Sequence, residues 1–97
     1  MTIPVLSIEG YVFKLTCFAC PQQFDVYDQL GQMVAYLRLR HGTFRVTCPD
    51  YGGQVVYEVQ TKGDGIFEKE EELPQLKKAV EKIQEWILDQ QHKLAFN

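Results

Sequence analysis

The feature that most constrains the fold is a long run of alternating apolar and polar residues at positions 24–60. Clusters of turn-forming residues interrupt the alternation at positions 28–32, 41–42 and 49–53. A period of two is typical of strands that bury one face, and short connections join antiparallel neighbours. This stretch therefore predicts an antiparallel meander with one face turned to the core.

The two later turns also predict how the strands pair. A two-residue loop at positions 41–42 and a four-residue loop at positions 50–53 keep apolar residues opposite apolar residues. A slip of one residue would turn every apolar side chain to the wrong face. The expected pairs are Leu37–Val46, Arg38–Arg45, Leu39–Phe44, Arg45–Glu58, Val46–Tyr57 and Cys48–Val55. Arg38, Arg45 and Glu58 should therefore form a charged row on the face away from the core.

A long amphipathic helix is expected after the sheet. Apolar residues recur at helical spacing after Leu73, and Pro74 suits the first turn of a helix. A helix over residues 74–94 would be about 30 Å long, whereas a six-residue strand spans only about 20 Å. The last turns, which contain Trp86 and Leu94, should therefore overhang the sheet.

These elements define a single α+β domain over residues 1–97, a four- or five-stranded antiparallel meander packed on one long C-terminal α-helix. Its expected parts are an N-terminal arm, the sheet, a loop and the helix, at residues 1–10, 11–60, 61–73 and 74–94. Pro4 makes the arm a loose segment or an edge strand, because proline cannot donate a ladder hydrogen bond. The side chains expected in the core are Phe13, Leu15, Phe24, Val26, Ala35, Leu37, Leu39, Phe44, Val46, Tyr57, Val59, Phe67, Leu76, Val80, Ile83 and Ile87.

The composition is that of an ordinary globular domain, with 45% apolar and 24% charged residues. The net charge of −3 disfavours a chain that binds nucleic acid over its whole surface. No apolar stretch reaches the roughly 18 residues of a membrane span, and no signal peptide is evident. We therefore expect a cytoplasmic protein with no membrane partner. Three cysteines, an odd number, fit reduced thiols rather than a disulfide framework.

The outer face of the sheet offers a candidate ligand-binding site at Tyr36, Arg38, Arg40 and Arg45. Guanidinium groups bind phosphate or carboxylate through two hydrogen bonds, and tyrosine offers a surface for stacking. The alternative is a solvated outer face, which every half-buried sheet needs. Nucleic acid is the less favoured ligand, because the total charge is negative and no lysine lies near the patch in the sequence.

The cysteines offer a candidate metal site. Cys17 and Cys20 form a C-x-x-C pair, which supplies two of the four ligands that zinc needs. Cys48 is a candidate third ligand, with His41 or His92 as the fourth. The sequence contains no second C-x-x-C pair, so the alternative is that the thiols are buried and bind no metal.

The sequence contains no nucleophile elbow, P-loop or dinucleotide fingerprint. We therefore expect a non-enzymatic protein-interaction module without a cofactor, such as a regulator or inhibitor. It would bind an unidentified protein partner, or a second copy of itself, through Trp86 and Leu94 at the overhanging helix end. The alternatives are anion or nucleic-acid binding through the arginine-rich sheet face, and a small zinc-stabilised domain.

Several short segments also carry a resemblance to other proteins. They are VYD at 26–28, Gly31, YLRLRHG at 36–42, PDYGG at 49–53, VYE at 56–58 and GDGIF at 63–67. This pattern resembles a group of short bacterial proteins, many of them encoded near phage or mobile elements. The resemblance implies no activity and no site residues for this chain.

Overall fold

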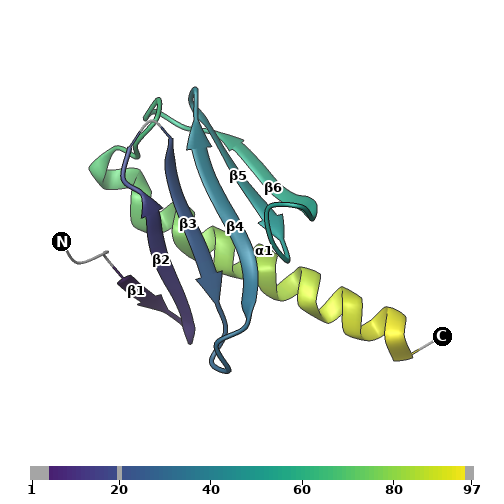
Figure 1. Ribbon diagram of the computed structural model, residues 1–97. Coiled ribbons are helices and arrows are strands. Elements are labelled where there is room, and N and C mark those ends of the chain that lie inside the picture. Colours follow the sequence, from purple (N-terminus) through teal and green to yellow (C-terminus); the bar gives the residue numbers. More distant parts are fainter. Residues whose placement is uncertain (1–4, 20, 96–97) are drawn as a thin grey trace.

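The computed structural model describes residues 5–19 and 21–95. Within these residues, six antiparallel strands form one sheet in sequential order, and one helix covers one face of it (Figure 1). The elements are β1 (Val5–Ile8), β2 (Tyr11–Cys17), β3 (Gln22–Tyr27), β4 (Met33–Arg40), β5 (Thr43–Cys48), β6 (Gln54–Gln60) and α1 (Lys69–Ala95). The α+β prediction is confirmed, but the sheet has six strands rather than the four or five expected.

The additional strand comes from the segment expected to be an N-terminal arm. β1 pairs with β2 through a two-residue turn in which Glu9 and Gly10 both have positive φ angles, of 50° and 88°. Positive φ at both central residues is the geometry of a type I′ hairpin turn, whose twist suits the flanking strands. Ile8 is buried in the core, so β1 is an edge strand with one anchoring side chain. Pro4 lies outside the described residues.

The turn at His41 and Gly42 has the same geometry, with φ angles of 53° and 74°. It pairs Leu39 with Phe44 and Arg38 with Arg45, as the sequence predicted. The pairing of Arg45 with Glu58 is also confirmed. The charged row therefore lies across β4, β5 and β6.

A β-bulge overturns one predicted pair. The register shifts between Val46 and Thr47, so that Thr47 lies opposite Val55 and Cys48 lies opposite Gln54. The predicted pairing of Cys48 with Val55 is therefore wrong, because the bulge adds one residue to β6 and reverses the faces beyond it. Val55 turns outward and is 48% exposed, while Val56 packs against the core.

The core lies between the sheet and α1 and follows the predicted alternation closely. The predicted core residues that are only partly buried are Leu15, Tyr57, Val59 and Ile87. The buried apolar side chains that the prediction left out are Ile8, Val34, Cys48 and Ala79. Val34 enters the core because a second bulge, on β4, moves it to the inner face.

The helix begins at Lys69, five residues before the predicted start, and Pro74 lies inside it rather than in its first turn. Glu71 explains the early start. Its carboxylate accepts a hydrogen bond from the N–H of Glu68 at 2.9 Å, which is half of a capping box. The same carboxylate accepts the N–H groups of Lys62 and Gly63 at 2.9 and 2.8 Å. One side chain therefore joins the preceding loop to the helix.

The loop between β6 and α1 is also fastened to the sheet by Gln22, a buried polar residue on β3. Its side-chain amide donates to Glu72 at 2.8 Å, and its side-chain oxygen accepts the N–H of Phe67 at 2.9 Å. These bonds satisfy a group whose burial would otherwise be costly. They also fix where α1 enters the inner face of the sheet.

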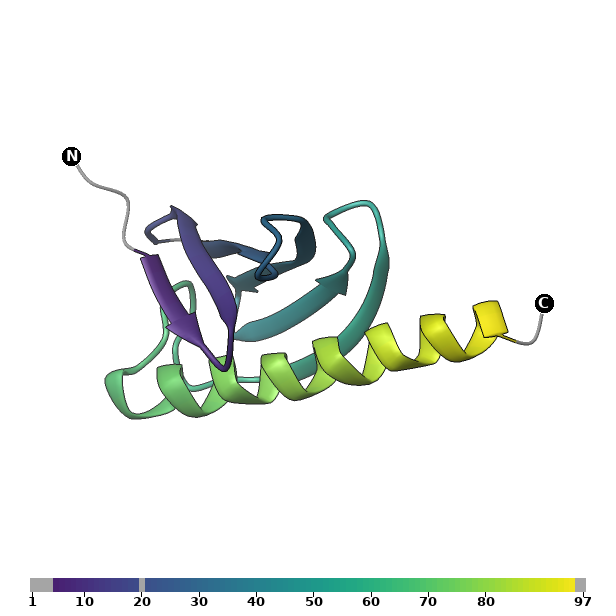
Figure 2. The ribbon, with the colours of Figure 1, turned by 90° about the horizontal axis from the view of Figure 1, so that it is seen from below.

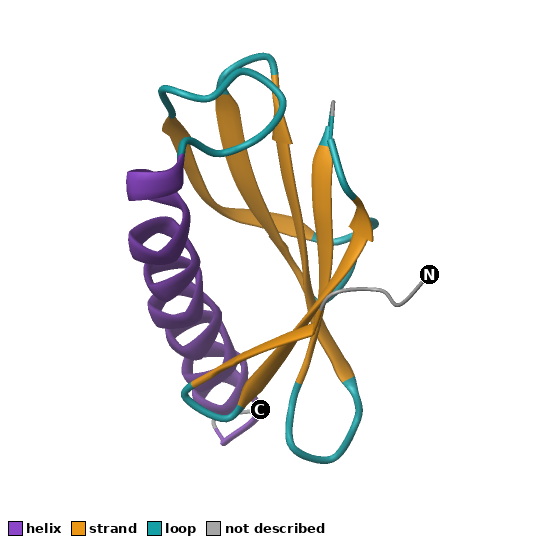
Figure 3. Cartoon of the chain, turned by 90° about the vertical axis from the view of Figure 1, so that its left-hand side faces the viewer, coloured by secondary structure: helices purple, strands orange, loops and turns teal. Residues whose placement is uncertain are grey.

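The helix is longer than the sheet is wide. The views from below and from the side show α1 lying along one face of a strongly twisted sheet (Figures 2 and 3). Its C-terminal turns run past the strands, as the comparison of lengths predicted. Among the described residues, no helix combines the length and the apolar character that a membrane crossing needs.

Candidate functional site

The face of the sheet away from α1 carries the predicted ligand-binding residues, Tyr36, Arg38, Arg40 and Arg45, which we call the arginine face. The first three alternate along β4 with the buried Leu37 and Leu39. Antiparallel pairing sets two rows across this face. The first row is Lys14, Asp25, Tyr36 and Thr47, and the second is Gln23, Arg38, Arg45 and Glu58.

The arginine face is hollowed. A concavity of about 580 Å³, the central hollow, spans it from β2 to β6. The lining residues are Thr16, Gln23, Asp25, Tyr36, Arg38, Arg45, Thr47, Tyr51, Gly53 and Val55. Its volume lies in the range of small-molecule sites, which is roughly 300–1,000 Å³.

Two smaller hollows continue the central one toward the turn between β4 and β5. The second hollow, of about 320 Å³, shares Arg38 and Arg45 with the central hollow and adds Arg40 and His41. The third, of about 190 Å³, shares Arg40 and His41 with the second and reaches Asp64. The three hollows therefore adjoin, and the arginines lie where they meet.

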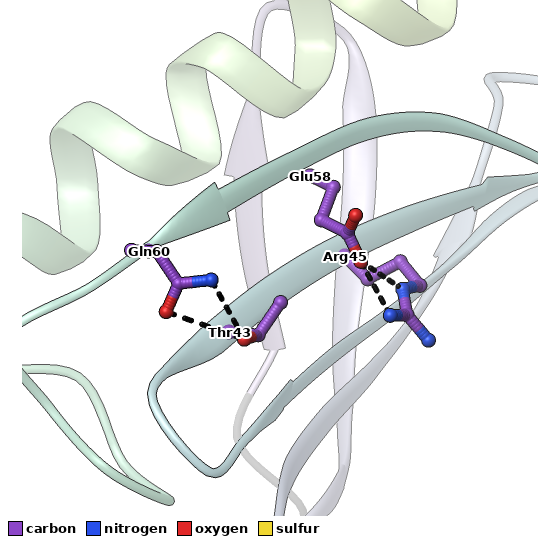
Figure 4. Close-up of polar contacts among 4 residues, drawn as sticks. All are labelled: Thr43, Arg45, Glu58 and Gln60. Atoms are coloured by element: carbon purple, nitrogen blue, oxygen red, sulfur yellow. Dashed lines mark hydrogen bonds and ion pairs between the residues drawn. The ribbon is translucent and has the colours of Figure 1, made fainter.

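Only one of the three arginines has an acidic partner among the described residues. Arg45 donates from Nε to Oε1 of Glu58 at 2.8 Å, and its Nη2 bonds the same oxygen (Figure 4). Thr43 and Gln60 form a neighbouring polar pair. Both charged groups of the Arg45–Glu58 pair are exposed, so the pair stabilises the fold by no more than about 1 kcal/mol. Arg38 and Arg40 form no ion pair with any described residue, and their charges face the hollows.

Two tyrosines form an aromatic wall. The ring of Tyr36 meets the ring of Tyr51 edge to face, with centroids 5.6 Å apart. The Tyr36 hydroxyl bonds the side-chain oxygen of Gln23. Burial raises the pKa of Tyr36, and the nearby Arg38 opposes that shift. Tyr51 is 76% exposed, so one ring surface is free for a ligand to stack on.

Among the charged and aromatic residues that line the central hollow, sequence reasoning missed two. Asp25 belongs to it because β3 pairs with β4 in a register that places Asp25 opposite Tyr36. Burial raises the pKa of this carboxyl, and Lys14 partly offsets that effect. Tyr51 belongs to it because the turn between β5 and β6 brings its ring to Tyr36. The spacing of polar residues on β3 is a signal for Asp25, whereas the placement of Tyr51 depends on the turn.

The candidate zinc ligands are not brought together among the described residues. Cys48 lies in the core, where burial raises the pKa of its thiol to about 12. Cys17 is half-buried, and its thiol lies 3.7 Å from the carbonyl oxygen of Ala19. In the described ranges, no three His, Cys, Asp or Glu side chains form a metal-binding group. Cys20 lies outside those ranges, so zinc binding stays a prediction.

The two residues predicted at the helix end have different surroundings. Trp86 is half-buried and packs against the core, whereas Leu94 is 74% exposed. Leu88, which the prediction left out, is 64% exposed near the same end. The exposed apolar surface at the C-terminal end of α1 is therefore carried by Leu88 and Leu94, with Trp86 on the side that faces the sheet.

Comparison of the chain with known proteins adds no family to this description. No family model matches it, and neither a curated protein nor a solved structure does so.

Proposed function

We propose that this chain is a small non-enzymatic binding module that holds an anionic group of its ligand on the arginine face. The observation that carries the proposal is that Arg38 and Arg40 line adjoining hollows without an acidic partner among the described residues. Guanidinium groups in such a setting bind carboxylate or phosphate through charge-assisted hydrogen bonds. Arg45, held by Glu58, provides a fixed wall beside them.

The lining of the central hollow supports binding rather than chemistry. Its described ionisable groups are one carboxyl, from Asp25, with two tyrosines and two arginines. None of these lining residues is a histidine or a cysteine, the side chains that most often serve as base or nucleophile at neutral pH. The free surface of Tyr51 and the polar Gln23 provide contacts that would orient a ligand.

The test is titration calorimetry with pyrophosphate at low salt, on the unmodified protein and on an Arg38→Gln, Arg40→Gln double variant. Because hydrogen bonds to charged groups contribute about 1.5–3 kcal/mol each, we expect roughly 10-fold or greater loss of affinity. A Lys69→Gln, Lys77→Gln variant removes the same charge from exposed positions on α1 and should bind normally. Equal affinity of all three proteins, or absence of binding to the unmodified one, contradicts the proposal.

A second candidate function is binding of a protein partner through the end of α1, in the manner of a regulator or inhibitor. It is favoured by the exposed Leu88 and Leu94 on turns that run past the sheet (Figure 1). Apolar side chains on a projecting amphipathic helix suit contact with another apolar surface. A second copy of this chain presents such a surface at the same place.

A further inference from the structure

The central hollow contains two groups of opposite charge that do not meet. Asp25 on β3 lies opposite Tyr36 on β4, and Arg38 lies two residues farther along β4. Diagonal positions of this kind are about 7–8 Å apart on an antiparallel pair, within reach of a long side chain. Arg38 nevertheless forms no ion pair with Asp25, and both residues line the space between them.

The Asp25 carboxylate has one charged neighbour, Lys14, which lies opposite it on β2. It accepts no hydrogen bond from the described residues, and the nearby Lys14 ammonium lies over the ring of Tyr27, 5.4 Å from its centroid. Burial raises the pKa of Asp25, and the charge of Lys14 only partly offsets that shift. Asp25 and Arg38 are therefore two half-buried charges. Asp25 can bind a donor group of a ligand, and Arg38 can bind an anionic group.

The rim of the hollow adds an apolar surface. Tyr51 is largely exposed beside Tyr36, and Val55 is turned outward by the bulge on β6. Tyr51 and Val55 line the same hollow as Asp25 and Arg38. Aromatic surface next to a few polar groups is the usual make-up of a small-ligand site.

The positive stretch on this face is short. Arg38 and Arg40 are two residues apart on a strand, or about 7 Å. Asp25 stands in the central hollow, and Asp64 stands in the third hollow beyond Arg40. A long polyanion crossing the face would meet a carboxylate at each end, which costs binding energy for every phosphate placed there. The arrangement suits one compact anionic group.

We propose that the central hollow binds a small amphoteric ligand, which combines one anionic group, one N–H donor group and an aromatic ring. The anionic group would lie at Arg38, the donor at Asp25 and the ring on Tyr51. This inference rests on the proposed anion-binding function and names the class of ligand. Nucleoside monophosphates with an exocyclic amino group and aromatic amino acids both have this chemistry.

The inference is tested by calorimetry with four probes: AMP, L-phenylalanine, inorganic phosphate and a ten-residue oligothymidylate. AMP or L-phenylalanine should bind at least roughly 10-fold more tightly than phosphate, since each additional charged hydrogen bond is worth about that factor. Asp25→Asn should remove this advantage and leave phosphate binding no weaker. Arg38→Gln should weaken every probe. Asp89→Asn, the same change on exposed α1, should alter nothing.

The outcomes separate the two proposals. If phosphate binds as tightly as AMP and L-phenylalanine, or if Asp25→Asn has no effect, the amphoteric ligand is wrong and anion binding stands. If the oligothymidylate binds most tightly, the face is a nucleic-acid site and the amphoteric ligand is again wrong. If none of the probes binds, both proposals are overturned. Thermal melts of each variant establish that it is folded.

Discussion

At Gly63 the loop before α1 leaves no room for a side chain. A Cβ there would lie 1.9 Å from the carbonyl oxygen of Ile66, which is part of the backbone and cannot rotate away. Gly63→Ala should therefore lower the free energy of unfolding by about 1–3 kcal/mol in a urea titration. At Gly52 the nearest atom is the side-chain oxygen of Asp50, 3.5 Å away, so Gly52→Ala should change stability by less than about 0.5 kcal/mol. Equal effects of the two substitutions would show that the loop opens easily.

Single residues also mark where sequence reasoning stops. Alternation predicted which face most side chains of residues 36–46 take, because Leu37, Leu39, Phe44 and Val46 each have polar neighbours. At Val55 and Val56 two adjacent valines fit either face equally well. The bulge decides between them, with Val55 turned outward and Val56 packed against the core. The same ambiguity at Met33 and Val34 hid the second bulge.

At the scale of the element, the start of α1 depends on the Glu71 carboxylate. Burial raises the pKa of this group, but its hydrogen bonds from Glu68, Lys62 and Gly63, with the charge of Lys62, outweigh burial, so the pKa is lowered. A carboxyl with a lowered pKa stabilises the folded state fully above the pKa of the unfolded chain. That contribution is lost as the pH falls through the folded-state pKa.

Glu71→Gln should therefore be less stable than the unmodified protein at pH 7, by about 1–3 kcal/mol, because three backbone N–H groups lose a charged acceptor. The difference should shrink at pH 3, below the ordinary pKa of a glutamate, because the unfolded chain then binds a proton that the folded carboxylate resists. Urea titrations at the two pH values measure it. Glu70→Gln, at an exposed residue paired with Lys62 at 3.7 Å, is the matched control. An equal difference in the free energy of unfolding at both pH values would refute the role of the charge.

The helix was predicted from its apolar period, but its start was not. Pro74 suits the first turn of a helix, so the predicted helix begins there. The acidic residues before it fall in the predicted loop of residues 61–73. The hydrogen bonds that extend the helix back to Lys69 come from residues 62 and 63, which approach Glu71 only after the loop has folded. A contact of that kind leaves no periodic trace in the sequence.

At the scale of the whole molecule, the layer order was predictable and the concavity was not. Alternating strands followed by an amphipathic segment have few packings other than a sheet covered by a helix. The shape of the central hollow depends on two features that the sequence does not give, the register between β3 and β4 and the position of the Tyr51 ring. The arginine face could thus be located from the sequence. The polar spacing on β3 also places Asp25 on that face, but its position opposite Tyr36 depends on the register between β3 and β4.

The projecting end of α1 carries a prediction about assembly. If this surface binds a second copy, light scattering on a size-exclusion column should show the apparent mass rising with concentration. A Leu88→Gln, Leu94→Gln variant should then stay monomeric, because it removes the exposed apolar surface. Leu73→Gln, at the opposite end of the helix and also exposed, should behave like the unmodified protein. A monomer at every concentration would count against self-association.

The position of Trp86 has an optical consequence. It is the chain's single tryptophan and packs against the core from α1, while the five tyrosines lie on the strands and their turns. Excitation absorbed by the tyrosines can therefore pass to the indole only while helix and sheet stay together. Tyrosine-sensitised emission from Trp86 therefore reports whether α1 is packed on the sheet, without any attached dye.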